Sequence, residues 1–126
     1  MKQIRTLGLM SGTSMDGLDC GLFDISLSLD YHLKWNCRAF ETISYSKNIR
    51  RMIGNVLSGD ENSILDAHIS LGKIFTSTVK KFLKGRKVDV IASHGQTISH
   101  KDGISTRQIG SPQNMHKLFQ VPVIYN

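Results

Sequence analysis

A glycine-rich polar turn near the N-terminus constrains the fold of this 126-residue chain more than any other feature. The turn, Ser11 to Gly17, ends in Asp-Gly and separates two apolar runs, Ile4 to Met10 and Leu18 to Leu27. Asp-Gly between apolar segments is a strong hairpin signal, because tight turns need residues that accept a positive φ. The sequence therefore predicts that the chain opens with two antiparallel strands.

The next segments predict a third strand and then two helices. Apolar and polar residues alternate from Leu33 to Ala39, which is typical of a half-buried antiparallel strand with one wet face. Apolar residues then recur at helical spacing over Ile49 to Leu57, behind an expected cap at Ser46. A second helix is expected to begin at an N-cap at Ser63 and to end at Gly85.

The second half of the chain returns to strands. Val88 to Ser93 is almost entirely apolar, as expected of a strand buried on both faces. Ile104 to Ile109 predicts a short strand, and Val121 to Tyr125 predicts a last one. Between these two strands, Ser111-Pro112 marks the capped start of a helix that reaches about Phe119. This order of elements predicts an α/β fold with a mixed sheet and flanking helices.

Composition excludes several classes of protein. The net charge is +6, but the basic residues are dispersed apart from Lys80 to Lys87, where cations complement the end of the expected helix. Aromatic residues do not interleave with a basic strand, so we expect no nucleic-acid partner. No apolar run approaches the roughly 20 residues of a membrane span, and no signal peptide opens the chain, so no membrane partner is expected. Cys20 and Cys37 lack metal-like spacing and suit a reducing cytoplasm.

The first polar turn contains the groups that hold phosphates. Glycines let backbone amides approach an anion closely, and serine and threonine hydroxyls add donors. Asp16 is a candidate for holding Mg²⁺ through water, since Mg²⁺ sheds its water reluctantly. An ordinary hairpin turn with local side-chain bonds explains the same residues, so both interpretations stay open at this point. The candidate phosphate-binding residues are Gly12, Thr13, Ser14, Met15, Asp16, Gly17, Leu18 and Asp19.

Two later polar motifs are further candidates. Ser93 to Thr97 is expected just past the end of a buried strand, where open α/β sheets bind ligands. Gln96 and Thr97 suit sugar hydroxyls, and His94 is either a ligand contact or a structural bridge between backbone groups. Gln108 to Gly110 precedes a helix start that either attracts anions or is simply capped. The candidate substrate-contacting residues are Ser93, His94, Gln96 and Thr97.

Taken together and in order, the motifs resemble the anhydro-N-acetylmuramic acid kinases of bacterial cell-wall recycling. The resemblance rests on Gly8 to Asp19, Ser93 to His100 and Gln108 to Gly110, and it extends over the whole chain. It implies the fold of the sugar kinase, Hsp70 and actin superfamily (ribonuclease H-like), in which two lobes enclose ATP and Mg²⁺. Residues 1–126 would then be the partial N-terminal, phosphate-binding lobe, with the C-terminal lobe absent.

The resemblance also implies an activity. Members of the family use ATP and water to convert 1,6-anhydro-N-acetylmuramic acid to N-acetylmuramic acid 6-phosphate in peptidoglycan recycling. Gly12 to Asp19 would hold the ATP phosphates, whereas Ser93 to Thr97 and Gly110 would line the cleft near the anhydro amino sugar.

The chain departs from the family pattern at two positions. Asn126 stands where the family begins an Asp-Phe-Arg motif, and Arg107 stands where the family often has an apolar residue. The family's water-activating aspartate lies beyond Asn126, so no catalytic residue is expected here. We therefore expect a truncated kinase that is inactive alone and is completed by a missing C-terminal segment or by a homodimer. The alternative is a non-catalytic remnant or interaction module.

Overall fold

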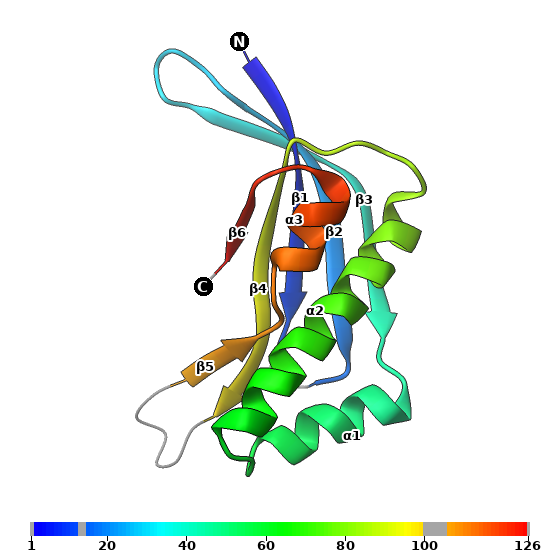
Figure 1. Cartoon of the computed structure of the whole chain (residues 1–126). Coiled ribbons are helices and arrows are strands. Elements are labelled where there is room, and N and C mark those ends of the chain that lie inside the picture. Colours follow the sequence, from blue (N-terminus) through cyan, green and yellow to red (C-terminus); the bar gives the residue numbers. More distant parts are fainter. Residues whose placement is uncertain (1, 13–14, 100–105, 126) are drawn as a thin grey trace.

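A computed structural model describes residues 2–12, 15–99 and 106–125 (Figure 1). The elements, in chain order, are β1 (Lys2–Ser11), β2 (Gly17–Leu27), β3 (Leu33–Ser44), α1 (Lys47–Val56), α2 (Glu61–Leu83), β4 (Val90–Ser99), β5 (Thr106–Ile109), α3 (Gln113–Phe119) and β6 (Val123–Tyr125). The order of strands and helices expected from the sequence is confirmed, and the fold is α/β with a mixed sheet.

The six strands form one sheet in which the first half is antiparallel and the second half is mixed. β1 and β2 form the expected hairpin, and β3 continues it as an antiparallel edge strand. On its other side, β1 pairs in parallel with β4. The far edge of β4 is shared, since β6 pairs in parallel with residues 91–93 and β5 pairs antiparallel with residues 96–99.

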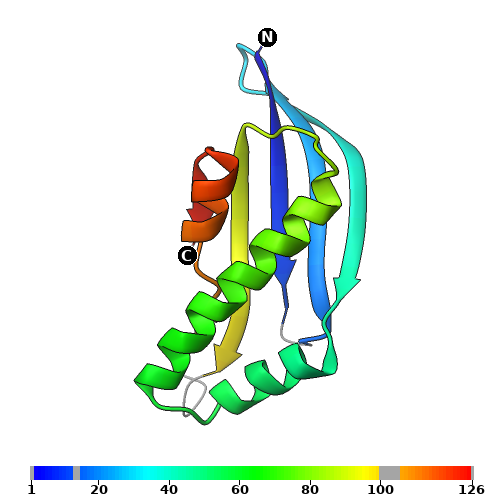
Figure 2. The same ribbon diagram turned by 45° about the vertical axis from the view of Figure 1, so that its right-hand side comes forward.

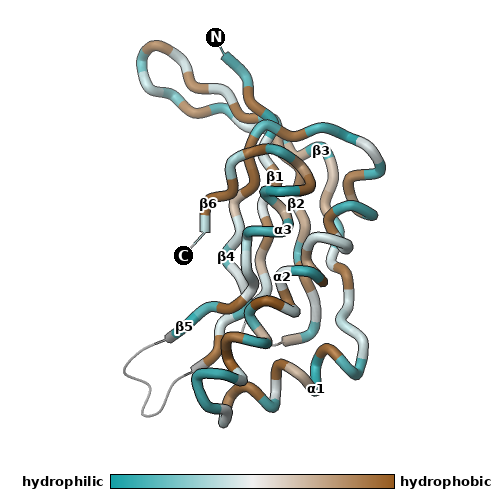
Figure 3. The backbone as a smooth tube through the Cα atoms, in the orientation of Figure 1, coloured by the Kyte–Doolittle hydropathy of each residue, from teal (hydrophilic) through white to brown (hydrophobic). Residues whose placement is uncertain are grey.

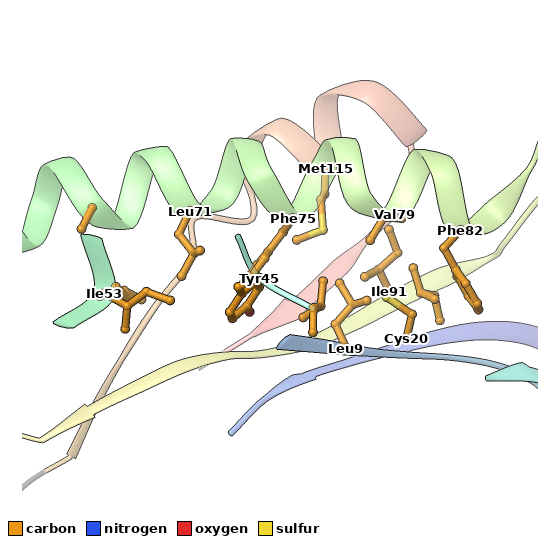
Figure 4. Close-up of a cluster of buried hydrophobic side chains, with 14 of the residues drawn as sticks. Leu9, Cys20, Tyr45, Ile53, Leu71, Phe75, Val79, Phe82, Ile91 and Met115 are labelled. Atoms are coloured by element: carbon orange, nitrogen blue, oxygen red, sulfur yellow. The ribbon is translucent and has the colours of Figure 1, made fainter. Parts of the chain in front are cut away.

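All three helices contribute to a core on one face of this sheet. Figure 2 shows α2 crossing that face obliquely, with α3 beside it. Phe75 and Val79 of α2, Met115 of α3 and Ile91 of β4 are fully buried between the two layers (Figure 4). Burying each such side chain stabilises the fold by about 1.5–3 kcal/mol relative to leaving it in water.

The third strand differs most from its prediction. β3 runs on to Ser44, and it is exposed rather than half-buried: Trp35 is 65% exposed and Phe40 is 63% exposed. It is the edge strand, and only Ala39 and Ile43 on its helix side pack against the core among the described residues. A bulge opposite Leu22 and Phe23 accommodates Arg38, whose guanidinium pairs with Asp24.

β4 is also longer than expected, and it is buried on one face only. It continues through Ser99 instead of ending at Ser93. Ile91 faces the helices and is fully buried, whereas Ala92 on the opposite face is only partly buried. An apolar run predicts a buried strand, but it does not tell which elements cover each of its two faces.

The helix ends are partly as predicted. Ser46 caps α1 and accepts a hydrogen bond from the Ile49 amide (3.3 Å). The N-cap of α2 is Asp60 and not Ser63, because the Asp60 carboxylate accepts the Ser63 amide (2.8 Å) and starts the helix earlier. The N-cap position of α3 falls on Pro112, one residue later than expected.

The basic run lies at the C-terminal end of α2, as expected. The helix ends at Leu83, and Arg86 turns back to donate to the carbonyl oxygens of Phe82 (2.6 Å) and Leu83 (2.9 Å). Cations at this position complement the helix dipole, so the run has a structural role. Within the described part of the chain, no helix combines the length and the apolar composition that a membrane span requires.

Candidate functional site

The turn between β1 and β2 is tied to the rest of the fold at its second end. Met15 donates its amide to the Gly12 carbonyl across the turn (3.3 Å). The Tyr45 amide, just after β3, donates to the Asp16 carbonyl (2.9 Å). Thr13 and Ser14, which belong to the candidate set, lie outside the described residues.

The two glycines of the turn are there for different reasons. A Cβ atom on Gly17 would lie 2.5 Å from the Ile43 carbonyl oxygen, so close packing against β3 requires glycine there. A Cβ on Gly12 would meet nothing within 4 Å, and Gly12 is not among the residues with positive φ. Neither packing nor backbone conformation requires a glycine at this position. Its bare backbone leaves room for a ligand to approach, as an anion-binding turn needs.

The remaining candidates of the first motif have distinct surroundings. Asp16 is exposed at the turn, whereas Asp19 lies in β2 and accepts a hydrogen bond from the Thr42 hydroxyl (2.6 Å). Leu18 is 1% exposed because its side chain is in the core, so only its backbone is available to a ligand. Met15 is partly buried against the same core.

A buried polar network supports the first end of the turn. Ser11 and Gln96 are both fully buried, and Tyr45 is 6% exposed. The Ser11 hydroxyl donates to Oε1 of Gln96, and it therefore accepts the hydrogen of the Tyr45 hydroxyl, since a serine has one proton to donate. Nε2 of Gln96 donates to the Gly12 carbonyl (2.7 Å) and to the Thr97 carbonyl (3.1 Å). Every polar atom of the Gln96 amide is thus used within the protein.

Tyr45 is the functional candidate that the sequence did not indicate. Its hydroxyl reaches Ser11 before the turn and its amide reaches Asp16 after it, so one residue ties both ends. Burial raises the pKa of Tyr45 to about 12, although the hydrogen bond to Ser11 opposes this shift. The phenol therefore stays protonated and keeps its donor at physiological pH. A tyrosine directly before a helix cap has no local pattern that would predict this role.

The second motif lies inside β4, not beyond its end. Its pairing with β1 shifts between Leu9 and Ser11, where β4 contains one extra residue. Gly95 sits in this bulge with φ 78°, and a Cβ there would lie 2.8 Å from the Ile109 carbonyl oxygen. The bulge rotates the strand so that Gln96 comes to face Ser11.

The neighbours of Gln96 remain available to a ligand to differing degrees. Ser93 is 5% exposed, and its hydroxyl has no hydrogen-bond partner among the described residues. Leaving a buried hydroxyl unpaired costs about 1–3 kcal/mol, which a ligand or a water would recover. His94 and Thr97 are partly buried, and Nδ1 of His94 makes only a long contact with the Gly95 carbonyl (3.4 Å).

The third motif packs against α2. A Cβ on Gly110 would lie 2.5 Å from the Phe75 ring, and Gly110 has φ 124°. The Gly110 amide donates to Nδ1 of His68 (3.0 Å), and the Ser111 amide donates to the His68 carbonyl (2.9 Å). Burial, and then the charge of Arg107, lower the pKa of His68, which keeps Nδ1 free to accept. These contacts support the interpretation of this segment as a helix start that is packed against α2.

The carboxylates near the turn do not by themselves make a metal centre. Among the described residues, no three His, Cys, Asp or Glu side chains gather closely enough to hold an ion. Asp16 is exposed at the turn and fits a cation held through water and phosphate oxygens.

Comparison with known proteins gives one consistent family. The family model described as anhydro-N-acetylmuramic acid kinase matches residues 4–126. Curated proteins named anhydro-N-acetylmuramic acid kinase include one from Legionella pneumophila, 30% identical over 94% of this chain and 33% of its own length. Another, from Microcystis aeruginosa, is 32% identical over 95% of this chain and 34% of its own length. One from Bacillus cereus is 36% identical over 83% of this chain and 31% of its own length.

The chain thus spans about a third of the length of these relatives. The match includes the polar turn, the bulged strand and the segment against α2 that the structure brings together. The chain belongs to the anhydro-N-acetylmuramic acid kinase family.

Proposed function

We propose that this chain supplies the phosphate-binding part of an ATP-dependent kinase acting on 1,6-anhydro-N-acetylmuramic acid. The reaction would use water to open the anhydro ring and would transfer the γ-phosphoryl group to O6 of the sugar. Membership of the kinase family supports the use of ATP and of a small-molecule substrate. Cytoplasmic peptidoglycan recycling would be its setting, and a segment corresponding to the rest of the relatives would be needed for turnover.

The open backbone at Gly12 carries this proposal. Phosphoryl transfer is accelerated mainly by donors and cations placed where negative charge develops. Residues Gly12 to Asp19 would present amides to the phosphates, and the hydroxyls of Thr13 and Ser14 would add donors. Mg²⁺, when bound with ATP, would neutralise phosphate charge, with Asp16 holding it through water.

The bulged strand would serve the turn and the sugar through different residues. Gln96 has no polar atom left for a ligand, so we assign it to holding the Gly12 end of the turn in place. His94 and Thr97 would then contact the anhydro sugar, whereas the unpaired hydroxyl of Ser93, in register with Leu9, lies on the helix side of the sheet. The water-activating base would come from outside this chain.

Substitution of Gly12 tests the phosphate assignment. Gly12→Val should fold normally, because nothing lies within 4 Å of the new Cβ, but its side chain would fill the space that the phosphates need. Binding of Mg·ATP, measured by calorimetry, should weaken about tenfold or more, as expected when the backbone can no longer approach the anion. Gly54→Val is the matched control, since Gly54 also has nothing within 4 Å but lies in α1.

Two outcomes would count against the proposal. Equal ATP binding by Gly12→Val and the unsubstituted chain would remove the turn from the nucleotide site. Clear phosphorylation of the anhydro sugar by this chain alone would show that no further segment is needed.

A non-catalytic interaction module is the second candidate function. It is favoured by large apolar side chains that stay exposed on the sheet, such as Phe40 and Ile124. An ATP titration without binding, together with formation of a stable complex through this face, would favour it over the kinase.

A further inference from the structure

A pocket of about 530 Å³ lies where the C-terminal ends of α2 and α3 meet the segment that leads into β4. It is at the opposite end of the sheet from the polar turn, because the turn follows β1, whereas the pocket precedes β4, which runs parallel to β1. Pockets for small ligands usually measure roughly 300–1,000 Å³. The pocket is therefore large enough for a small molecule and lies apart from the residues proposed to bind ATP and the sugar.

The lining of this pocket is mostly apolar, as in most ligand sites. Leu83 of α2 is 3% exposed, and Val88, Phe119 and Val121 are partly buried against the core. Leu118, near the end of α3, also lines the pocket and stays 49% exposed. Figure 3 shows brown, hydrophobic residues at the end of α3 and in the segment between α3 and β6. A ligand with an apolar body would remove this surface from water.

Three cationic side chains line the same pocket, and one of them is already in use. Arg86 donates from Nε to the Leu83 carbonyl (2.9 Å) and from Nη2 to the Phe82 carbonyl (2.6 Å). Its guanidinium also lies 5.2 Å from the centre of the Phe82 ring. Arg86 therefore serves the C-terminal end of α2.

The other two cations, Lys80 and Lys87, have no carboxylate beside them. Both are exposed, and neither forms a salt bridge within the described part of the chain. None of the described residues that line the pocket is Asp or Glu. Lys87 follows α2, so the helix dipole, whose effect falls off within the last turn, does not account for it. The pocket thus combines an apolar lining with a positive charge that no acidic side chain balances.

We propose that this pocket binds a small amphipathic anion, in which a single carboxylate is attached to an apolar chain or ring. The apolar part covers Leu83, Leu118 and Phe119, and the carboxylate is held by Lys80 and Lys87. Lysine side chains lie along apolar surface and keep their charged ends in water, which suits a carboxylate at the mouth of the pocket. A doubly charged phosphate would lose more hydration against the apolar lining, so a singly charged group is favoured. The site does not depend on the proposed kinase activity.

Titration of octanoate into the isotope-labelled chain, followed by NMR, tests the site. The amide signals of Val88, Leu118 and Phe119 should shift and saturate at millimolar octanoate, whereas those of Phe40 and Ile124, on the face of the sheet opposite the helices, should stay in place. Octylamine has the same chain with a positive charge and should bind about tenfold more weakly. Phenylbutyrate replaces the chain with a ring, and the tighter of the two carboxylates identifies the apolar part.

Charge reversal separates the two lysines from the rest of the surface. Lys80→Glu combined with Lys87→Glu should weaken octanoate binding about tenfold or more, because two attractions become two repulsions. Lys47→Glu combined with Lys73→Glu is the matched control, since it gives the same net charge at two exposed helix positions outside the pocket and should leave binding unchanged. Leu118→Ala should weaken binding about threefold, because it removes part of the apolar lining.

The following results would overturn the proposal: no saturable binding of either carboxylate, equal binding of octylamine, an equal loss in the control pair, or shifts confined to the face of the sheet opposite the helices. Unchanged amide signals outside the pocket check that each variant folds. If the charge-reversed pair does not fold, Lys80→Gln combined with Lys87→Gln replaces it and should still weaken binding about threefold.

Discussion

The two faces of the sheet come from the same strands and are both apolar, yet only one is packed. On the face toward α2, Leu7, Cys20 and Leu22 are fully buried. On the opposite face, Met10 is 50% exposed and Phe40 is 63% exposed. Both crossovers, β3 to β4 and β4 to β6, place their helices on the same side (Figure 2). The difference shows that the path of the two crossover connections, and not the hydrophobicity of the side chains, decided which apolar residues became buried.

The largest contrast should come from removing one phenylalanine from each face. Phe75→Ala should lower the free energy of unfolding by about 3–5 kcal/mol, because it opens a cavity in the fully buried core. Phe40→Ala should change it by about 0.5 kcal/mol or less, since the side chain is mostly in water already. Urea unfolding of both variants measures the two values. Similar losses would mean that the open face is packed in solution.

A smaller loss of stability is expected from breaking the buried polar network of Ser11, Tyr45 and Gln96. Gln96→Leu would remove the acceptor for the Ser11 hydroxyl proton and the donor to the Gly12 carbonyl, at a cost of about 1–3 kcal/mol. Hydrogen exchange at the Met15 and Tyr45 amides should accelerate as the turn loosens. Thr97→Val is the neighbouring control and should leave both amides protected. Unchanged exchange in Gln96→Leu would show that the turn holds its shape without the network.

The smallest effect concerns a charge on the covered face, where the sheet extends past the helices. The Asp24 carboxylate accepts hydrogen bonds from Arg5 and Arg38, and these two partners, Arg5 more than Arg38, lower its pKa to about 2. A carboxyl whose pKa is lower in the folded state stabilises the fold above its ordinary pKa of about 3.9. This contribution should be lost as the pH falls from about 4 toward 2.

Urea midpoints between pH 5 and pH 2 measure this loss of stability. Asp24→Asn should flatten the dependence, because the amide cannot titrate. Equal slopes for the two proteins would mean that the ion pairs with Arg5 and Arg38 are not maintained in solution.

Local sequence patterns determined the order and type of the elements. The Asp-Gly turn predicted the β1–β2 hairpin, and apolar periodicity predicted α1 and α2, because turn chemistry and helical spacing act between residues a few positions apart. The sequence also indicated the three polar motifs as candidate binding segments. The half-buried state predicted for β3 and the N-cap predicted at Ser63 were wrong, since β3 is an exposed edge strand and Asp60 caps α2.

The tertiary structure alone decided how the motifs cooperate. Ser11 and Gln96 are 85 positions apart, and Ser11 and Tyr45 are 34 positions apart. Their contact depends on the parallel register of β1 and β4 and on the extra residue at Gly95, neither of which leaves a local signal. The covering of one sheet face follows from the handedness of the crossovers, which is a property of the whole topology. The sequence by itself therefore determined which groups the turn contains, whereas tertiary packing determined what holds the turn and which face stays open.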